Sequence, residues 1–395
     1  MKPLSNIKIL DLTRVLAGPY STMLMQELGA EVIKVEMPGR GDDARYFGPF
    51  KNNTSAYFIS INRGKKSISL NLKSEEGRKI LLELVKKVDI VTENFRPGTM
   101  EKLGLSYDVI KKINPRIIYA STSGFGQTGP DSKKPAYDML VQAMSGMMSI
   151  TGWQDKPPTR VGVSIGDLGA GLYTIIGILS ALYQRTITGE GQQVDVAMLD
   201  CQLSLLENAI VRHDVSGQSP KPNGNQHPTI TPFQVFKTKD SYMALAMGNN
   251  VMWANFCKAI NRTDLLENDN YSDNLKRTEN RDELLAEIIP IIEKKDLSEW
   301  VEIFEEAKLP YSPVNSIGEV MEHKQVKARN MIVETESKAT GKIKVAGNPI
   351  KMTNIDEENF REKAPEIGEH NSEIYKEMLG LSEKEIQDLK EKGVI

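Results

Sequence analysis

The sequence predicts an α/β protein in which a large, doubly wound domain is followed by a smaller α+β domain. Near the start of the chain, residues 7–12 and 31–35 have the pattern of strands and residues 19–28 that of a helix, which makes a βαβ unit with parallel strands. Further along, residues 233–237 and 242–246 flank a short polar turn, as in a β-hairpin. The first pattern indicates the doubly wound sheet, and the second indicates the separate domain.

The large domain continues with one further helix and three strands, which we expect at residues 74–87, 89–91, 116–120 and 194–198. This succession is typical of a Rossmann-like sheet, whose ligands bind in the crevice beyond the carboxyl ends of the strands. The loops at residues 13–18, 94–98 and 121–130 should therefore border a single site.

Composition supplies the domain boundaries. A polar stretch rich in glycine and proline marks a linker. We expect the N-terminal part of the large domain at 1–215, this linker at 216–228, the small domain at 229–325, and a return linker with the C-terminal part of the large domain at 326–395. In the last segment we expect a strand at 342–345, a solvated charged connection at 356–363, and helices at 372–379 and 382–392.

Charge and residue usage argue against several classes of function. Lys and Arg number 50 against 53 Asp and Glu, so the net charge of −3 gives no general attraction to nucleic acid or an anionic membrane. Cys201 and Cys257 lie far apart and the four histidines lack metal-ligand spacing, so we expect neither a metal site nor disulfides. The start has no secretory pattern, and the most apolar stretch, 168–183, is shorter than a membrane span. We therefore expect a cytoplasmic protein in which this stretch is a buried helix.

A GxGxxG pattern is formed by Gly124, Gly126 and Gly129, just after a predicted strand. A dinucleotide fingerprint would need a helix to begin there and an acidic residue about 20 positions later. Proline and polar residues follow instead, so a glycine-rich loop beside another ligand is the better interpretation.

Asp167 is the strongest candidate for chemistry. It precedes an apolar helical run, where an aspartate is most simply an N-cap that accepts backbone hydrogen bonds. However, Gly166, Gly169 and Gly171 remove side chains where a bulky ligand could approach the backbone. A partly desolvated carboxylate at a helix end could also act as a nucleophile or base. The residues alone leave both interpretations open.

Eight motifs, taken together and in this order, resemble those of the family III CoA-transferases, also called the CaiB/BaiF family. They are DLTRVLAGP (11–19), GAEVIKVEMPGRGDDAR (29–45), LNLKSEEG (70–77), ENFRPG (93–98), GFGQTGP (124–130), GVSIGDLGAGLY (162–173), TGEGQQVDVAML (188–199) and GNQHPTITPFQVFKT (224–238). The resemblance runs nearly end to end. It implies CoA transfer between an acyl-CoA and a carboxylic acid, and an interlocked homodimer in which each chain is a ring threaded through the other.

The resemblance also implies residue roles. In the transferases the aspartate at the position of Asp167 is the nucleophile, which forms a mixed anhydride and then an aspartyl-CoA thioester, with no metal and no permanently bound cofactor. The positions that match the family's contacts with CoA are Leu16, Ala17, Leu70, Asn71, Leu72, Lys73, Asn94, Phe95, Arg96, Lys102 and Tyr137. The implied partners are the two substrates and a second copy of the chain.

Departures from the patterns of individual branches bear on the reaction. Tyr137 stands where the racemases of the family have a histidine, and a tyrosine with an ordinary pKa of about 10 is a poor base at neutral pH. Leu16 stands where the oxalate-specific branch has glutamine, which argues against oxalate. The motif wording is closest to the branch that uses succinyl-CoA and dicarboxylic acids. Arg14, Arg45 and Arg160 would either bind a distal carboxylate or form structural ion pairs. A 2-methylacyl-CoA racemase and a catalytically silent acyl-CoA-binding protein remain the alternatives.

Overall fold

The computed structural model describes residues 1–356 and 358–395, which form two compact units. The large unit comprises Met1–Met147, Arg160–Gly217 and Lys324–Ile395, and the small unit comprises Met148–Thr159 and Gln218–His323. The small unit thus includes a segment that precedes Arg160 in the chain. Within this unit the Gly224 N–H donates to the Gly152 carbonyl at 2.7 Å, and a Cβ on Gly224 would lie 2.5 Å from the Trp153 ring. Close packing against residue 224 explains why this segment belongs to the small unit.

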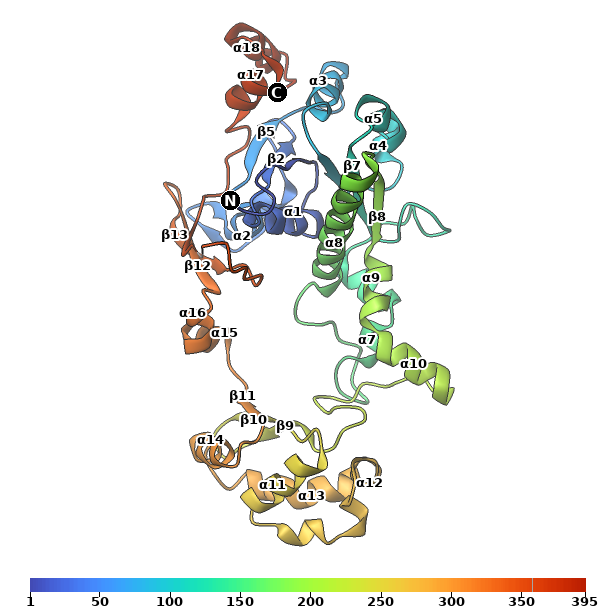
Figure 1. Cartoon of the computed structure of the whole chain (residues 1–395), viewed down its shortest axis with the longest axis vertical. Helices are drawn as coiled ribbons and strands as arrows, with labels where there is room; N and C mark the ends of the chain where they lie inside the picture. The colour runs from blue at the N-terminus through green and yellow to red at the C-terminus, as the bar shows by residue number, and fades with distance from the viewer. Residues whose placement is uncertain (357) are drawn as a thin grey trace. The chain divides into compact units, whose positions relative to one another are not determined.

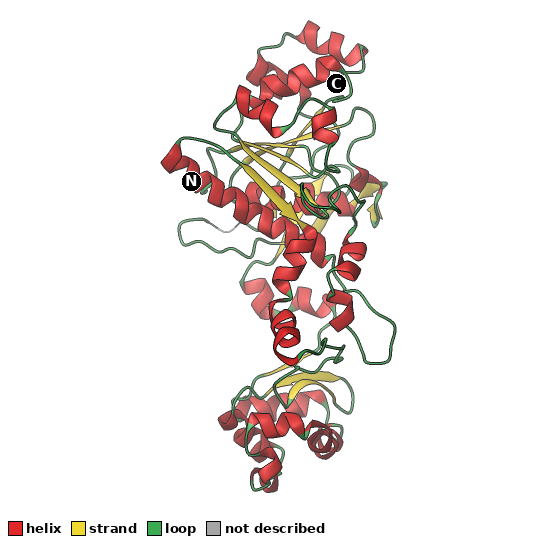
Figure 2. Cartoon of the chain, turned by 90° about the vertical axis from the view of Figure 1, so that its right-hand side faces the viewer, coloured by secondary structure: helices red, strands yellow, loops and turns green. Residues whose placement is uncertain are grey.

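A six-stranded parallel sheet forms the centre of the large unit, in the order β5-β2-β1-β6-β7-β8 (Figures 1 and 2). Its strands are β1 (Lys8–Asp11), β2 (Glu31–Glu36), β5 (Lys66–Ser69), β6 (Ile90–Glu93), β7 (Ile118–Ser123) and β8 (Gln193–Ala197). The predicted βαβ unit and parallel sheet are confirmed. The strand order reverses between β1 and β6, and a crevice for ligands opens at such a reversal.

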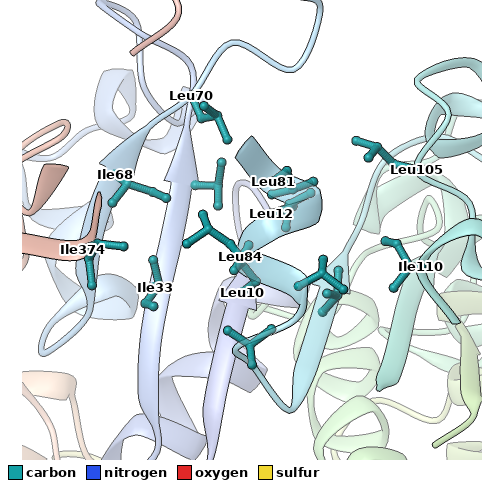
Figure 3. Packing of buried hydrophobic residues seen from close by; sticks show 14 of the residues in the cluster. Leu10, Leu12, Ile33, Ile68, Leu70, Leu81, Leu84, Leu105, Ile110 and Ile374 are labelled. Atoms are coloured by element: carbon teal, nitrogen blue, oxygen red, sulfur yellow. The ribbon is translucent and has the colours of Figure 1, made fainter. Parts of the chain in front are cut away.

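One face of the sheet packs against four helices, which are α3 (Glu75–Val85), α5 (Tyr107–Ile113), α17 (Asn371–Leu379) and α18 (Glu383–Glu391). In α3, Leu81, Leu84 and Val85 recur at helical spacing and are fully buried. Figure 3 shows Leu81 beside Leu12 and Leu84 beside Leu10. The last two predicted helices therefore complete the core of the large unit rather than forming a separate layer.

The other face packs against α1 (Ala17–Glu27) and α8 (Ile165–Thr188). Helix α8 has 24 residues and is longer than the apolar stretch 168–183 that the sequence predicted. Among the described residues, it is the one helix long and apolar enough to cross a membrane. Half of its most apolar window is buried in the protein, as expected of a core helix. Its residues Thr174 and Ile178 lie under the sheet, whereas Ile176 and Tyr183 are exposed. The helix ends at Gly189, whose φ of 77° suits glycine.

The remaining elements of the large unit are short. They are the 3₁₀ helix η1 (Asp43–Tyr46), the hairpin β3 (Phe50–Lys51) and β4 (Thr54–Ser55), and the helices α2 (Ala56–Asn62), α4 (Thr99–Lys102), α6 (Asp138–Met144), α9 (Met198–Leu205), α10 (Glu207–Ser216) and α16 (Lys324–Ala328). Helix α7 (Met147–Ile150) spans the boundary of the two units.

The chain returns to the large unit through a second sheet, which holds β12 (Ile332–Ser337), β13 (Gly341–Ala346) and β14 (Phe360–Arg361). The predicted strand near residue 343 is confirmed as β13, but its partner β12 was not predicted. The expectation of a purely solvated connection at 356–363 is wrong, because Arg361 pairs with the buried Glu27 at 2.8 Å. Residue 357 lies outside the described residues.

The small unit holds the antiparallel sheet β11-β10-β9 and its own hydrophobic core. The hairpin of β9 (Phe233–Lys237) and β10 (Tyr242–Ala246) has the predicted bounds, and β11 (Tyr311–Pro313) adds a third strand. The helices of this unit are α11 (Asn250–Ala259), α12 (Asn274–Glu279), α13 (Arg281–Ile292), α14 (Leu297–Glu306) and α15 (Ile317–Glu322), with 3₁₀ helices η2 (Thr263–Leu266) and η3 (Asp269–Tyr271).

Candidate active site

A cavity of about 310 Å³ lies at the carboxyl ends of β1, β6 and β7, where the reversal of strand order places a crevice. The predicted site residues that line it are Arg14, Leu16, Ala17, Asn94, Phe95, Arg96, Tyr137 and Asp167. The glycine-rich loop after β7 contributes Gly124, and bends and turns rather than a helix follow it. The three loops expected to border one site thus do so within the large unit.

A second cavity of about 380 Å³ lies beside the loops that follow β1, β2 and β5. It brings together the predicted residues Leu70, Asn71, Leu72 and Lys73. Its wall is largely apolar, with Arg40 and the exposed Lys73 among its lining residues. Arg14 and Phe95 line both cavities, which are therefore neighbours along the edge of the sheet.

Asp167 is the third residue of α8 and not its N-cap, which is Ser164. Among the described residues, no group donates a hydrogen bond to the Asp167 carboxylate. Burial raises its pKa to about 7, and the negative charge of Asp138 contributes in the same direction. The carboxylate is thus partly stripped of water without a compensating cation.

The capping role expected of Asp167 belongs to Asp138, the first residue of α6. Its Oδ1 accepts the Gly166 N–H at the start of α8 at 2.8 Å, and its Oδ2 accepts from Gln142 Nε2 at 2.7 Å. The Arg160 guanidinium lies 3.8 Å from the same carboxylate. Because a different helix satisfies the start of α8, Asp167 is left available to a ligand.

Gly166 and Gly171, which flank Asp167, permit close packing between helices. The interpretation that the glycines make room for a ligand stays a prediction. A Cβ on Gly166 would lie 2.4 Å from Gln202 Nε2. A Cβ on Gly171 would lie 2.8 Å from the Ala17 carbonyl oxygen. At Gly169 a Cβ would make only an ordinary contact, 3.5 Å from a Leu205 methyl. Close approach of α8 to α1 and α9 sets the position of Asp167 at the cavity wall.

Tyr57, in α2, lines neither cavity, but the charge of Asp167 acts on it. Burial raises the pKa of its phenol to about 12, and the charge of Asp167 adds to the shift. No local pattern in the sequence indicates this interaction, because the two residues belong to helices far apart in the chain.

Several predicted residues are engaged elsewhere. Arg45 pairs with Glu36 at 2.7 Å, donates to the Pro365 carbonyl and lies 3.7 Å above the Phe58 ring, so its role is structural. Lys102 is exposed on α4, and among the described residues neither it, Arg45 nor Arg160 lines the two cavities. Arg14 is the predicted substrate arginine that lines both.

The sequence of the chain is similar to those of known CoA-transferases. Residues 4–371 match the model of CoA-transferase family III. The chain is 42% identical over 383 residues to an Acetyl-CoA:oxalate CoA-transferase of Acetobacter aceti, with 97% of each chain covered. It is 40% identical to the human Succinyl-CoA:glutarate CoA-transferase, with 100% of this chain and 90% of the relative covered.

A solved structure of a CaiB/BaiF family protein from Brucella suis also matches the fold. It superposes with a TM-score of 0.84 at 36% identity, and the match covers 95% of this chain and 99% of that one. The chain therefore belongs to CoA-transferase family III and is an enzyme of that family, which confirms the resemblance seen in its motifs.

Proposed function

We propose that this enzyme moves CoA reversibly from an acyl-CoA, such as succinyl-CoA, to a carboxylic acid through covalent intermediates on Asp167. The observation that carries the proposal is a desolvated carboxylate, without a cation or hydrogen-bond donor among the described residues, at the wall of the cavity that unites the predicted CoA-binding loops. Such a carboxylate keeps its nucleophilicity because no partner stabilises its charge.

The proposed reaction has two symmetrical halves. The Asp167 carboxylate attacks the thioester carbonyl of the donor, which gives a mixed anhydride and releases the CoA thiolate. The thiolate attacks the Asp167 carbonyl, which expels the donor acid and leaves an aspartyl-CoA thioester. The acceptor carboxylate attacks this thioester, and the thiolate released then attacks the acceptor carbonyl. The new acyl-CoA departs and Asp167 regains its charge.

CoA would occupy both cavities in this proposal. The apolar wall beside Leu72 suits the adenine ring, and Lys73 and Arg40 at the same cavity suit its phosphates. The pantetheine arm would then pass Arg14 and Phe95 and bring the thioester to Asp167. At that end, the N–H groups of Ala17 and Gly18 in the first turn of α1 lack intrahelical acceptors and can stabilise an oxyanion.

The acceptor acid is the least specified part of the proposal. Arg14 is half exposed and makes one ion pair, with Asp43 at 3.3 Å, so it can meet a distal carboxylate in the cavity. This favours a dicarboxylic acid, as in the succinyl-CoA:glutarate relative. Leu16 does not exclude oxalate as the acceptor, because a relative 42% identical to this chain is named for oxalate.

We also propose that the enzyme is an interlocked homodimer in the cytoplasm, without a permanently bound cofactor. The exposed apolar residues Leu172, Ile176, Tyr183 and Ile187 on α8 support an association with a second copy. Light scattering with size-exclusion chromatography tests the dimer, and a monomeric mass at micromolar concentration would contradict it.

A donor and acceptor panel tests the activity. Succinyl-CoA and acetyl-CoA are incubated with oxalate, glutarate and succinate, and new acyl-CoA species are followed by mass spectrometry. We expect exchange that Asp167→Asn abolishes and that Asp388→Asn, on the distant α18, leaves unchanged. The quenched wild-type enzyme should carry CoA on the peptide that contains residue 167. Absence of exchange, together with racemisation of a chiral 2-methylacyl-CoA, would replace the proposal with a racemase.

A further inference from the structure

The side chain of Asn94 joins two loops at the point where the strand order reverses. Its Oδ1 accepts the Arg14 N–H at 2.8 Å, and its Nδ2 donates to the Arg14 carbonyl at 2.8 Å. The last paired residues of β1 and β6 are Asp11 and Thr92. Beyond the ends of the two strands, the side-chain amide of Asn94 therefore bonds both backbone groups of Arg14, as a neighbouring strand would. It joins the loop after β1 to the loop after β6.

The loop that receives this amide is under backbone strain. Val15 has a φ of 67°, a left-handed conformation that is rare for a β-branched residue and persists only when its surroundings enforce it. The Val15 N–H donates to Asp42 Oδ1 at 3.1 Å, and the other oxygen of Asp42 pairs with the buried Lys34 at 2.7 Å. Two consecutive residues of the loop are thus held from different loops, Arg14 by Asn94 after β6 and Val15 by Asp42 after β2.

This junction lies between the two cavities. Arg14 and Phe95, on either side of the Asn94 bridge, are lining residues that the cavities share. The Phe95 N–H is fixed by Glu93 Oε2 at 2.8 Å, and the Arg14 guanidinium lies 5.2 Å from the centre of the Phe95 ring. The bridge therefore sets the position of one cavity relative to the other.

We call the cavity beside Leu72 the nucleotide cavity and the cavity that contains Asp167 the reaction cavity. We propose that Asn94 is a positioning residue that holds these two cavities at the separation that one CoA molecule requires. This inference rests on the proposed function, and it differs from the direct contact with CoA that the family resemblance implies for Asn94. A ligand that fills both cavities gains affinity only when their separation matches its length. A ligand that fills one cavity is insensitive to that separation.

Two ligands and two variants distinguish positioning from direct contact. Isothermal titration calorimetry measures the affinity of CoA, which spans both cavities, and of adenosine 3′,5′-bisphosphate, which fills the nucleotide cavity alone. In Asn94→Ala we expect the Kd of CoA to rise about tenfold or more, because the separation is no longer fixed, while that of the bisphosphate changes less than about twofold.

Asn114→Ala is the matched control. The Asn114 amide likewise bridges backbone groups, donating to the Val85 and Val88 carbonyls at 3.0 and 3.1 Å, but it lies outside both cavities. We expect it to lower the thermal midpoint without changing either Kd. Asn94→Asp, which keeps the acceptor and loses the donor, should show the selective loss of CoA affinity even where Asn94→Ala fails to fold.

Equal losses of affinity for CoA and the bisphosphate in the Asn94 variants would overturn the inference in favour of direct contact. Unchanged affinity for both would overturn it as well. Failure of the proposed function is recognised separately in the donor and acceptor panel, where the wild-type protein would bind CoA but would not exchange it between acids.

Discussion

The pKa values of two desolvated carboxylates in the large unit, those of Asp11 and Asp167, shift in opposite directions. Beneath the loop after β1, Asp11 contacts Lys65 at 3.0 Å and accepts from the hydroxyls of Thr22 and Thr13. Burial alone would raise the pKa of Asp11, but the charges of Lys65 and Lys34 lower it to about 2. At the cavity, Asp167 has no such partner among the described residues, and its pKa rises to about 7. Burial is common to both acids, so the partners decide the outcome.

The difference separates stability from reactivity. The paired acids under the first loop fix its backbone, because Lys34 also donates to the Thr13 carbonyl at 2.8 Å and pairs with Asp42. Among the described residues, no cation pairs with Asp167, which leaves its charge to react. The large unit thus holds a network of buried ion pairs under the loop after β1 and, in the first turn of α8, a carboxylate with no ion pair among the described residues.

The largest expected effect is on turnover. Replacing Asp167 by Asn should lower kcat/KM for CoA transfer by about 10³-fold or more, because the proposed nucleophile is lost. Asp138→Asn keeps the oxygen that accepts the Gly166 N–H and should cost less than about tenfold. Steady-state rates with the best donor and acceptor pair measure both. Similar losses in the two variants would mean that Asp167 has no special role.

Removing the cation that pairs with the buried Asp11 should lower the stability of the fold. Lys65→Met leaves Asp11 buried without its nearest cation and should lower the free energy of unfolding by about 3–5 kcal/mol. The exposed pair of Lys79 with Glu75 offers a control, since Lys79→Met should change it by less than about 1 kcal/mol. Urea unfolding followed by circular dichroism provides the values. A small effect of Lys65→Met would show that the buried pair does not stabilise the loop.

Removing the charge of Asp167 should stabilise the fold. Its pKa is above the unfolded value of 3.8, so the folded protein disfavours the ionised form and loses stability as pH rises from about 4 to about 7. Asp167→Asn should therefore be more stable than wild type by about 1–3 kcal/mol at pH 8, and equally stable near pH 4. Asp11→Asn should shift stability in the opposite direction at pH 8. Thermal unfolding at the two pH values tests the signs.

The smallest effect is on the pH profile. A nucleophile whose pKa is about 7 is mostly protonated at pH 6 and mostly ionised at pH 8. The value of kcat/KM should therefore rise about tenfold between these two pH values. A flat profile over this range, with chemistry rate-limiting, would contradict the raised pKa.

The sequence predicted what depends on local pattern. The strand–helix–strand at residues 7–35 and the hairpin at 233–246 rest on periodicity and turn residues, and both are confirmed. Strand β12 and the Glu27–Arg361 pair join segments distant in the chain, which no local pattern encodes. The sequence could therefore describe each element better than the contacts between elements.

The site shows the same limit. Asp167 stands out by its position before an apolar run, and the loops that line its cavity follow from strand order. Packing between separate elements determines three other features. These are the capping of α8 by Asp138, the effect of the Asp167 charge on Tyr57, and the pairing of Arg45 with Glu36. The packing role of Gly166 likewise depends on Gln202, a residue of another helix that lies beside it.

The donation from Gly166 to Asp138 has a consequence for how this fold can diverge. Since a separate residue completes the start of α8, exchanging Asp167 leaves that helix end intact. A single codon change could then convert a transferase into a folded protein that holds acyl-CoA without turning it over. Such descendants would need no compensating mutation, so chains of this architecture that lack the reactive acid are expected to persist as carriers or sensors of thioesters.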